Sequence, residues 1–322
     1  MSRRSLGEGG RVSVAAIQTH GLTKYYGQVV GLEELSLEVD QGEVFGFLGA
    51  NGAGKTTTIR MLLDLVRPSS GCASVLGFDC HHQGLEARRR IGYLPGEMPI
   101  YPDLTGAGYL SFLSSLGAQP ASRSRLELLL RRFDVSDLDL KRQMRDYSHG
   151  MKRKLGIVQA LMTDAPVLIL DEPTSGLDPL MIEAFSETID ELARAGRTTV
   201  FLSSHILSEV DRICQRIGLV RSGRLVAVRT LHELRAAAPR RLTVLFSKPV
   251  DADVPCIPGT ILIAREPERW VFDVQGPLGE VIPLLAQLPV ADVSLAPFTL
   301  DDAILRLLGP PSPGGFGEAC GS

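Results

Sequence analysis

The stretch "GANGAGKTT", Gly49 to Thr57, decides the fold of this 322-residue chain. It fits the pattern G-x-x-x-x-G-K-[ST] and lies between the apolar run "EVFGFL" and the helical pattern "KTTTIRMLLDLV". A loop of this kind closes its backbone N–H groups around phosphate oxygens. We expect Lys55 to reach the β- and γ-phosphates of a nucleotide and the Thr56 hydroxyl to bind Mg²⁺. The residues predicted to contact the nucleotide here are Gly49, Asn51, Gly52, Gly54, Lys55, Thr56 and Thr57.

The segment "VLILDEP", Val167 to Pro173, supplies the second half of the site. Its apolar residues predict a buried strand, and two carboxylates follow at the carboxyl end, where α/β sheets bind their ligands. We expect Asp171 to hold Mg²⁺ through a water molecule. Glu172 is the candidate to orient and polarise the attacking water, which is a base role for a carboxylate.

Around these motifs, strands and helices alternate in a pattern typical of an α/β core with parallel strands. Short β-type runs in residues 15–39 indicate an antiparallel sheet beside the core, and a mostly helical insertion occupies about residues 98–165. Beyond the core, segments such as "LTVLFS" and "VADVSLA" predict a small α+β module. The predicted divisions are a disordered tail 1–14, a nucleotide-binding domain 15–235, an accessory domain 236–309 and a disordered tail 310–322.

The composition is typical of a soluble globular protein, with 44% hydrophobic and 22% charged residues. The net charge of −3 argues against bulk attraction to nucleic acid or anionic lipid. No window approaches the roughly 20 apolar residues of a membrane span, and the first residues do not read as a signal peptide. The five cysteines show no metal-ligand spacing, so we expect reduced thiols in the cytosol. If the protein works at a membrane, we expect another chain to span it.

Four further motifs stand in a recognisable order around the two halves of the site. They are "KYYG" before the phosphate loop, "YSHGM" in the helical insertion, "SGLD" after the carboxylates, and "LSSH" at the end of the next apolar run. With these motifs, residues 15–235 resemble the nucleotide-binding subunit of ATP-binding cassette (ABC) transporters. The resemblance implies a P-loop fold with a RecA-like core, an antiparallel β subdomain and a helical subdomain.

The resemblance also implies roles for residues outside the two main motifs. "YSHGM" corresponds to the family's signature, usually LSGGQ, in which Ser148 and Gly150 are expected to touch the γ-phosphate of ATP held by the other subunit. Asp178, in "SGLD", belongs to the loop that communicates across the dimer. His205 is expected to be the switch histidine at the γ-phosphate, and Tyr26 the aromatic that stacks on adenine.

Two departures from the family pattern leave questions open. Gly96 stands where the family usually has a glutamine that contacts Mg²⁺ and the membrane partner, and the neighbouring Glu97 is the candidate replacement. A carboxylate only accepts hydrogen bonds whereas a glutamine also donates them, so this assignment stays open. In the signature, His149 and Met151 replace the usual Gly and Gln. We interpret His149 as a solvated residue rather than a phosphate ligand.

Three consecutive cations, Lys152, Arg153 and Lys154, follow the signature near the start of a predicted helix, where positive charge is unfavourable. Two interpretations stay open: the cations draw in the phosphate, or they face solvent. His81 and His82 are interpreted as solvated residues of a surface loop rather than metal ligands.

The function implied by the resemblance is that of an ATPase subunit that dimerises, with itself or with a second subunit, around two ATP molecules. It would use Mg²⁺ and drive a separate integral-membrane permease from the cytoplasmic face of the membrane. The "YSHGM" variant and the appended module resemble exporters of drugs, antibiotics or lipids. The alternative is a soluble cassette ATPase that acts on ribosomes or DNA. Such relatives carry two cassettes or long coiled coils, which this sequence does not show, so we expect no nucleic-acid partner.

Overall fold

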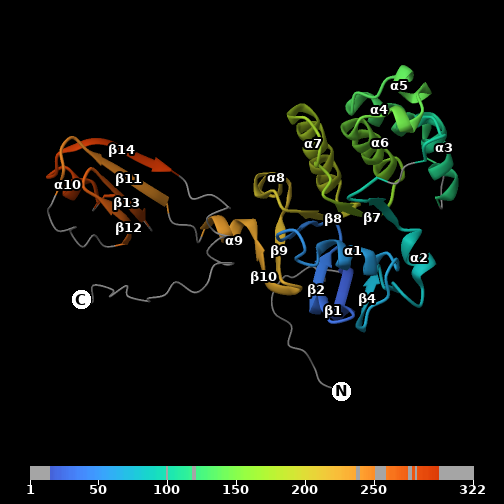
Figure 1. The fold of residues 1–322 in the computed structure, drawn as a ribbon, viewed down its shortest axis with the longest axis horizontal. Coiled ribbons are helices and arrows are strands. Elements are labelled where there is room, and N and C mark those ends of the chain that lie inside the picture. Colours follow the sequence, from blue (N-terminus) through green and yellow to red (C-terminus); the bar gives the residue numbers. More distant parts are fainter. Residues whose placement is uncertain are drawn as a thin grey trace. The chain divides into compact units, whose positions relative to one another are not determined.

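The computed structural model describes residues 15–98, 101–117, 121–236, 240–250, 259–274, 278–279 and 281–296. Its contacts divide the chain after Thr230 into two compact units, which are described separately (Figure 1). The predicted tails 1–14 and 310–322 lie outside the described residues, as does the segment "PFTLDDAILRLLG".

A six-stranded sheet forms the centre of the first unit, in the order β10-β9-β3-β8-β7-β6. Its strands are β3 (Val44–Leu48), β6 (Ile91–Leu94), β7 (Val167–Asp171), β8 (Thr199–Ser204), β9 (Arg216–Arg221) and β10 (Arg224–Thr230). The first five run parallel, and β10 is antiparallel at one edge. Every residue of β3 and β7 is buried, because helices cover both faces of a parallel sheet. The predicted α/β core is confirmed.

A second sheet, antiparallel and in the order β2-β1-β4-β5, lies in the same unit. It consists of β1 (Ala15–Tyr26), β2 (Val29–Asp40), β4 (Ser70–Val75) and β5 (Phe78–Asp79). One apolar core joins the two sheets through side chains that include Leu37 of β2, Phe47 of β3 and Ile59 of α1 (Lys55–Leu62). The phosphate loop between β3 and α1 therefore stands on a rigid support.

The chain between β6 and β7 is mainly helical and forms one group in Figure 1. Its helices are α3 (Gly106–Leu116), α4 (Arg123–Arg132), α5 (Asp137–Lys141) and α6 (His149–Leu161). The end of α6 packs closely on β6, since a Cβ atom at Gly92 would lie 2.5 Å from the carbonyl oxygen of Ala160. This group is the predicted helical subdomain of the cassette fold.

The remaining helices of the first unit connect neighbouring strands. They are α2 (Gly84–Arg88), α7 (Pro179–Ala195) and α8 (Leu207–Ile213). Helix α7 begins at Pro179, directly after the "SGLD" motif. Asp178 caps its first turn and Gly196 ends it in the left-handed region, which are both common helix boundaries.

The second unit has its own sheet, in the order β12-β13-β11-β14, and its own core. Its elements are α9 (Leu231–Ala236), β11 (Arg240–Phe246), β12 (Thr260–Glu266), β13 (Arg269–Val274), α10 (Val281–Leu285) and β14 (Val290–Ala296). Trp270 is fully buried at the centre of that core, with the Phe246 ring centroid 4.8 Å away. The predicted α+β character of this module is confirmed.

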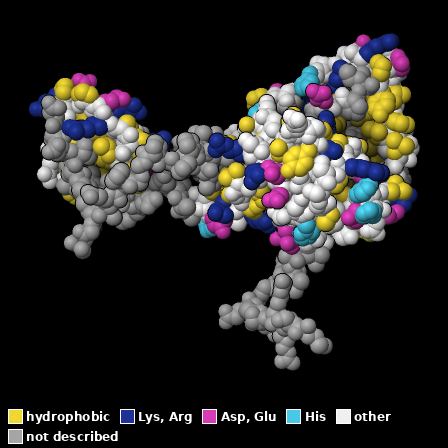
Figure 2. Space-filling model, turned by 60° about the horizontal axis from the view of Figure 1, so that its bottom comes forward, with side chains coloured by type: hydrophobic (Ala, Val, Ile, Leu, Met, Phe, Trp, Pro, Cys, Tyr) yellow, Lys and Arg dark blue, Asp and Glu magenta, His cyan; other side chains and the backbone are white. Residues whose placement is uncertain are grey.

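The surface of the first unit mixes both signs of charge on the face shown in Figure 2, where Lys and Arg side chains alternate with Asp and Glu. Within the described parts of the chain, every helix is too short or too polar to cross a membrane.

Candidate nucleotide-binding site

Glycines shape the phosphate loop between β3 and α1. Gly52 and Gly54 adopt left-handed backbone angles (φ 78° and 111°), which L side chains rarely adopt. At Gly49, a Cβ atom would lie 2.4 Å from the carbonyl oxygen of Val220 on β9, so a larger residue does not fit. At Gly52, a Cβ atom would meet nothing within 4 Å. The loop is thus pressed against β9 on one side and open on the other, which suits a phosphate group held by backbone N–H groups.

Lys55, the first residue of α1, has a buried side chain directed into the loop. Its Nζ donates to the carbonyl oxygens of Gly49 at 2.7 Å and Ala50 at 3.3 Å. It also lies 3.3 Å from Oε1 of Glu172. These partners compensate the burial of the ammonium group. The contact with Glu172 brings the two motifs found in the sequence into one site.

Thr56, the residue after Lys55, contacts Asp171 at the end of β7. Thr56 Oγ1 donates to Asp171 Oδ2 at 3.0 Å, and Ser203 Oγ donates to Asp171 Oδ1. A hydroxyl next to a carboxylate offers the hard oxygen ligands that Mg²⁺ prefers, so this donor set fits the predicted metal. The role of Ser203 was not predicted. The sequence feature that could have indicated this role is the pair of serines at the carboxyl end of "TVFLSS", a strand that pairs with β7.

Glu172 stands between a cation and an imidazole. Its backbone is left-handed (φ 50°), and its N–H donates to both the carbonyl and the hydroxyl oxygen of Ser203 at 3.1 Å. Its Oε2 lies 2.6 Å from Nδ1 of His205, while Oε1 faces Lys55. The carboxylate remains 20% exposed, so it is fixed in direction and still accessible to water.

One cavity of about 760 Å³ collects most of the predicted site residues, a volume in the range of small-molecule sites. The predicted residues that line it are Tyr26, Asn51, Gly52, Gly54, Lys55, Thr56, Thr57, Glu97, Asp171, Glu172 and His205. Gly49 is placed behind the loop, against β9. Tyr26, the residue predicted to stack on adenine, remains 44% exposed at the end of β1, with Nζ of Lys24 5.3 Å from its ring centroid. Arg60, Tyr93 and Ser175 also line the cavity and were not predicted.

Ser148, Gly150 and Asp178 do not line this cavity. Ser148 is the N-cap of α6, where its Oγ accepts the N–H of Met151 at 3.2 Å. Asp178 is the N-cap of α7, where its Oδ1 accepts the N–H of Met181 at 3.0 Å. Within one chain, the two side chains stabilise helix ends.

The signature segment lies against the "SGLD" loop. His149 is exposed, and its ring lies so near Gly176 that a Cβ atom there would be 2.3 Å from Cδ2 of His149. A Cβ atom at Gly150 would in turn lie 3.0 Å from the carbonyl oxygen of Gly176. Any displacement of the first turn of α6 therefore acts on this loop.

Among the three cations after the signature, Arg153 fits neither of the two interpretations that the sequence left open, a phosphate contact or a solvent-facing side chain. Arg153 is only 1% exposed and donates to backbone carbonyl oxygens, so it neither faces solvent nor reaches a phosphate. Lys154 lies 3.6 Å from the carboxylate of Asp134, and Lys152 is half-buried. The burial of Arg153 could not be predicted from the charged run, because its hydrogen-bond acceptors come together only when the loops fold.

Burial shifts the pKa of two groups beside the carboxylates. Burial raises the pKa of Tyr93 to about 12, and the charge of Asp171 adds to this effect. Burial also lowers the pKa of Arg153 to about 10, although Asp171 and Glu172 favour its charged form. Near pH 7 the phenol is neutral and the guanidinium remains charged.

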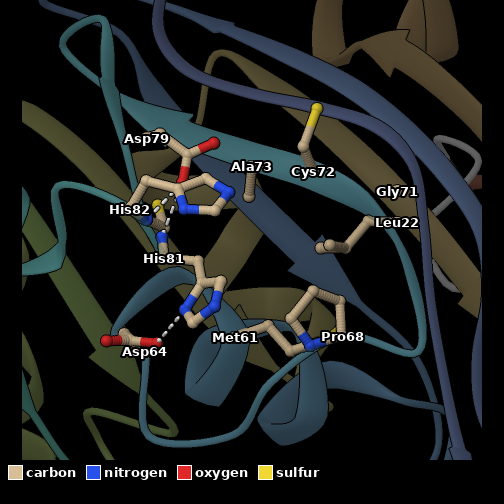
Figure 3. Close-up of a pocket in the computed structure, with 11 residues that line it drawn as sticks. Leu22, Met61, Asp64, Pro68, Gly71, Cys72, Ala73, Asp79, His81 and His82 are labelled. Atoms are coloured by element: carbon tan, nitrogen blue, oxygen red, sulfur yellow. Dashed lines mark hydrogen bonds and ion pairs between the residues drawn. The ribbon is translucent and has the colours of Figure 1, made fainter.

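A second pocket, of about 70 Å³, lies next to α1 (Figure 3). His81 points to Asp64, with Nδ1 at 3.2 Å from Oδ1, and Asp79 accepts the backbone N–H groups of His81 and His82. His82 is exposed, but His81 is half-buried and paired, which corrects its interpretation as a solvated residue. The described residues contain no group of three or more His, Cys, Asp or Glu side chains that could hold a metal ion.

Comparison with known proteins places this geometry in a family. The ABC transporter family model matches residues 32–175. A Nostoc ABC transporter ATP-binding protein, described as uncharacterized, is 45% identical over 64% of this chain and 62% of its own length. The daunorubicin resistance ATP-binding protein of Streptomyces coeruleorubidus is 37% identical over 91% of this chain and 96% of its own length. The dimeric structure of an ATP-binding cassette bound to ADP and Pi shares the fold at 20% identity, with a TM-score of 0.61 over 67% of this chain and 98% of that one. The chain belongs to the ATP-binding subunits of ABC transporters, which are ATPases.

Proposed function

We propose that this chain binds ATP together with Mg²⁺ in the cavity at the phosphate loop, dimerises around two ATP molecules and drives a separate membrane permease. The observation that carries the proposal is the meeting of Lys55 and Thr56 with Asp171 and Glu172. Residues that bind phosphate and residues that act on water thus stand on one side of one sheet, at the carboxyl ends of its parallel strands.

The proposed chemistry assigns one task to each group. Thr56 and Asp171 would hold Mg²⁺, which offsets the charge that develops on the phosphate oxygens. Lys55 and the loop N–H groups would bind the β- and γ-phosphates. Glu172 would accept a hydrogen bond from water and direct its oxygen to the γ-phosphorus, while the bond to the bridging oxygen breaks and ADP leaves. His205, 2.6 Å from Glu172, would keep that carboxylate oriented.

The position of the signature supports the proposed dimer. Ser148 and Gly150 lie at the first turn of α6, outside the cavity of their own chain. In the proposal they contact the γ-phosphate of ATP held by the partner subunit, and each cavity is complete only with a second chain. The related cassette bound to ADP and Pi is dimeric. Both a homodimer and a heterodimer satisfy this arrangement.

The proposed partner is an integral-membrane permease, which would hold this chain at the cytoplasmic face of the membrane. The family supports such a partner, and no described helix of this chain is suited to span a bilayer. We propose export of a drug, antibiotic or lipid-like substrate, because a relative that matches over 91% of this chain is a daunorubicin resistance protein. Glu97, which lines the cavity, is the proposed replacement for the missing glutamine.

Glu172→Gln tests the catalytic assignment. The substitution removes the anionic base but keeps the size of the side chain, so phosphate release should fall by about 10²–10⁴-fold. The Kd for ATP should stay within about threefold, because Glu172 holds no phosphate. The control is Glu127→Gln on α4, an exposed carboxylate far from the loop in sequence, which should leave the rate unchanged. Normal turnover in Glu172→Gln would contradict the proposed role.

Affinity purification from membranes and cytosol tests the proposed partner. We expect the tagged full-length chain to copurify with a multispanning protein in the membrane fraction, more strongly for Glu172→Gln with ATP. Copurification with ribosomes or DNA instead would favour the soluble alternative.

A further inference from the structure

Arg153 joins two loops of the site to the helix that carries the signature. It lies in the second turn of α6 and is 1% exposed. Its guanidinium donates to carbonyl oxygens of both loops, and none of the ion pairs that the structure contains between described residues involves it. Nη1 donates to Pro95 at 2.6 Å and Gly96 at 3.2 Å, Nε to Pro173 at 2.9 Å, and Nη2 to Asp171 at 2.6 Å and to Glu172.

Every N–H donor of the Arg153 side chain forms a hydrogen bond. An arginine has five N–H donors in a rigid planar fork, and five hydrogen bonds are formed here. The acceptors lie at the carboxyl ends of β6 and β7 and directly after them, and these two strands are neighbours in the sheet. Carbonyl groups at the carboxyl ends of parallel strands need partners once the ladder stops. One side chain therefore donates hydrogen bonds to the backbone at the ends of two neighbouring strands.

The loop after β7 has a particular need for such a partner. Glu172 is held at φ 50°, a region that costs a residue with a Cβ atom of the order of 1 kcal/mol or more and persists only where the surroundings fix it. Its N–H is held by Ser203 and its carbonyl oxygen by Arg153. The two contacts clamp the peptide groups on either side of the carboxylate that faces the cavity.

We propose that Arg153 is a positioning residue that ties Glu172 and the Gly96–Glu97 segment to the first turns of α6. Displacement of Ser148 and Gly150 is then transmitted through one rigid side chain to Glu172. The inference rests on the proposed function, in which Ser148 and Gly150 serve ATP on the partner subunit. It adds a direct route by which contact with that ATP orients the water-directing carboxylate of the same chain.

The test compares Arg153→Lys and Arg153→Gln with Lys154→Gln. Lysine keeps the charge but presents its three donors at a single point, so it cannot span both loops. Lys154 is the adjacent cation, and its partner is Asp134 rather than either loop. All variants are made in the full-length chain, and circular dichroism verifies that they are folded.

Amide hydrogen exchange is the first readout, because it requires no hydrolysis. We expect peptides that cover residues 91–97 and 170–176 to exchange at least tenfold faster in both Arg153 variants, and to be unchanged in Lys154→Gln. Unchanged exchange in folded Arg153→Lys and Arg153→Gln would overturn the proposal. Hydrogen exchange tests the role of Arg153 without any ATP hydrolysis. A wild-type chain that released no phosphate would contradict the proposed function but not the role of Arg153.

Steady-state kinetics is the second readout. A misplacement of about 1 Å at a reacting group can cost about 10²-fold in rate, so kcat should fall by about that factor in both Arg153 variants. The Kd for ATP should stay within about threefold of the wild-type value. The number of ATP molecules bound per chain should be unchanged. A fall in rate accompanied by an equal loss of ATP binding would indicate a merely structural role and would overturn the proposal.

Discussion

Backbone strain and close approach at single residues fix the geometry of the phosphate site. Glu172 adopts a left-handed angle immediately after a buried strand, and Gly49 packs against the carbonyl oxygen of Val220. Both residues lie at the carboxyl end of a parallel strand, where the chain leaves the sheet. Their surroundings cannot relax without moving β7 or β9. The site is therefore sensitive to changes that add a single carbon atom.

Gly49→Ala tests this sensitivity. The new Cβ atom would lie 2.4 Å from a backbone oxygen that cannot rotate away, so the phosphate loop must shift. We expect the affinity for ATP to fall at least tenfold, as measured by equilibrium binding. The control is Gly77→Ala, between β4 and β5, where the φ angle is 80° and nothing lies within 4 Å of the new atom. That variant should lose about 1–2 kcal/mol of unfolding free energy but keep its ATP affinity. Unchanged affinity in Gly49→Ala would contradict the argument.

At the scale of residues, the sequence predicted side chains that line the cavity but not the residues that hold the backbone of Glu172. Lys55 and Glu172 stand in short motifs whose context is local, and the structure places both on one cavity. Ser203 and Arg153 act through backbone groups that are distant in sequence. No spacing rule reveals such a contact, because it exists only after the strands have paired.

At the scale of elements, the helical subdomain is joined to the core by polar contacts as well as by α6. Arg132, at the end of α4, donates to both carboxylate oxygens of Glu191 on α7, at 2.6 and 2.8 Å. It also donates to Thr188 on the same helix. Two parallel hydrogen bonds give this pair a defined geometry, which exposed ion pairs usually lack. The pair therefore contributes to the angle between α4 and α7.

Glu191→Gln should destabilise the first unit in a pH-dependent way. The hydrogen bond from Arg132 lowers the pKa of the Glu191 carboxyl below its usual range. A lowered pKa contributes stability above the unfolded-state pKa, near 4.3, and that contribution is lost as the pH falls through the folded-state pKa. We expect a loss of about 0.5–1 kcal/mol at pH 7, measured by urea unfolding, that shrinks below about pH 4.

The matched control for this prediction is Glu187→Gln, which removes an exposed carboxylate one turn earlier on α7. It should change the unfolding free energy by less than the Glu191 variant at pH 7. An effect of Glu191→Gln that stays the same from pH 7 to well below pH 4 would show that the ionised pair contributes nothing.

The sequence predicted strands well where every residue of the strand is buried. It predicted the ends of helices and strands less well. The runs "VFGFL" and "VLILD" predicted β3 and β7 because a strand covered on both faces has no polar side. The start of α7 was missed, although Asp178 followed by Pro179 is a cap with a first-turn proline. The segment "TILIAREPERWVFDV" forms two strands, β12 and β13, which pair as a hairpin. Its hydrophobic pattern alone does not mark the turn.

At the scale of the whole molecule, the described residues of each unit form apolar clusters of their own. One cluster of the first unit runs between its two sheets, and the cluster of the second unit surrounds Trp270. The described residues that line the nucleotide cavity all belong to the first unit. Units with their own cores can fold as separate cooperative blocks. Binding of a nucleotide should then stabilise one block and not the other.

Trp270 makes this difference measurable, because it is the only tryptophan of the chain and lies in the second unit. Its fluorescence should report unfolding of the second unit, while circular dichroism at helical wavelengths reports mainly the first. At an ATP concentration about 100 times Kd, the first unit gains about 2.7 kcal/mol, which raises its midpoint by roughly 5–10 °C. We expect the tryptophan transition to move by less than about 1 °C. Lys55→Ala is the control and should abolish the shift in circular dichroism. If both transitions rise together with ATP in the wild-type chain, the two units unfold as one block, and the second core depends on the nucleotide state of the first.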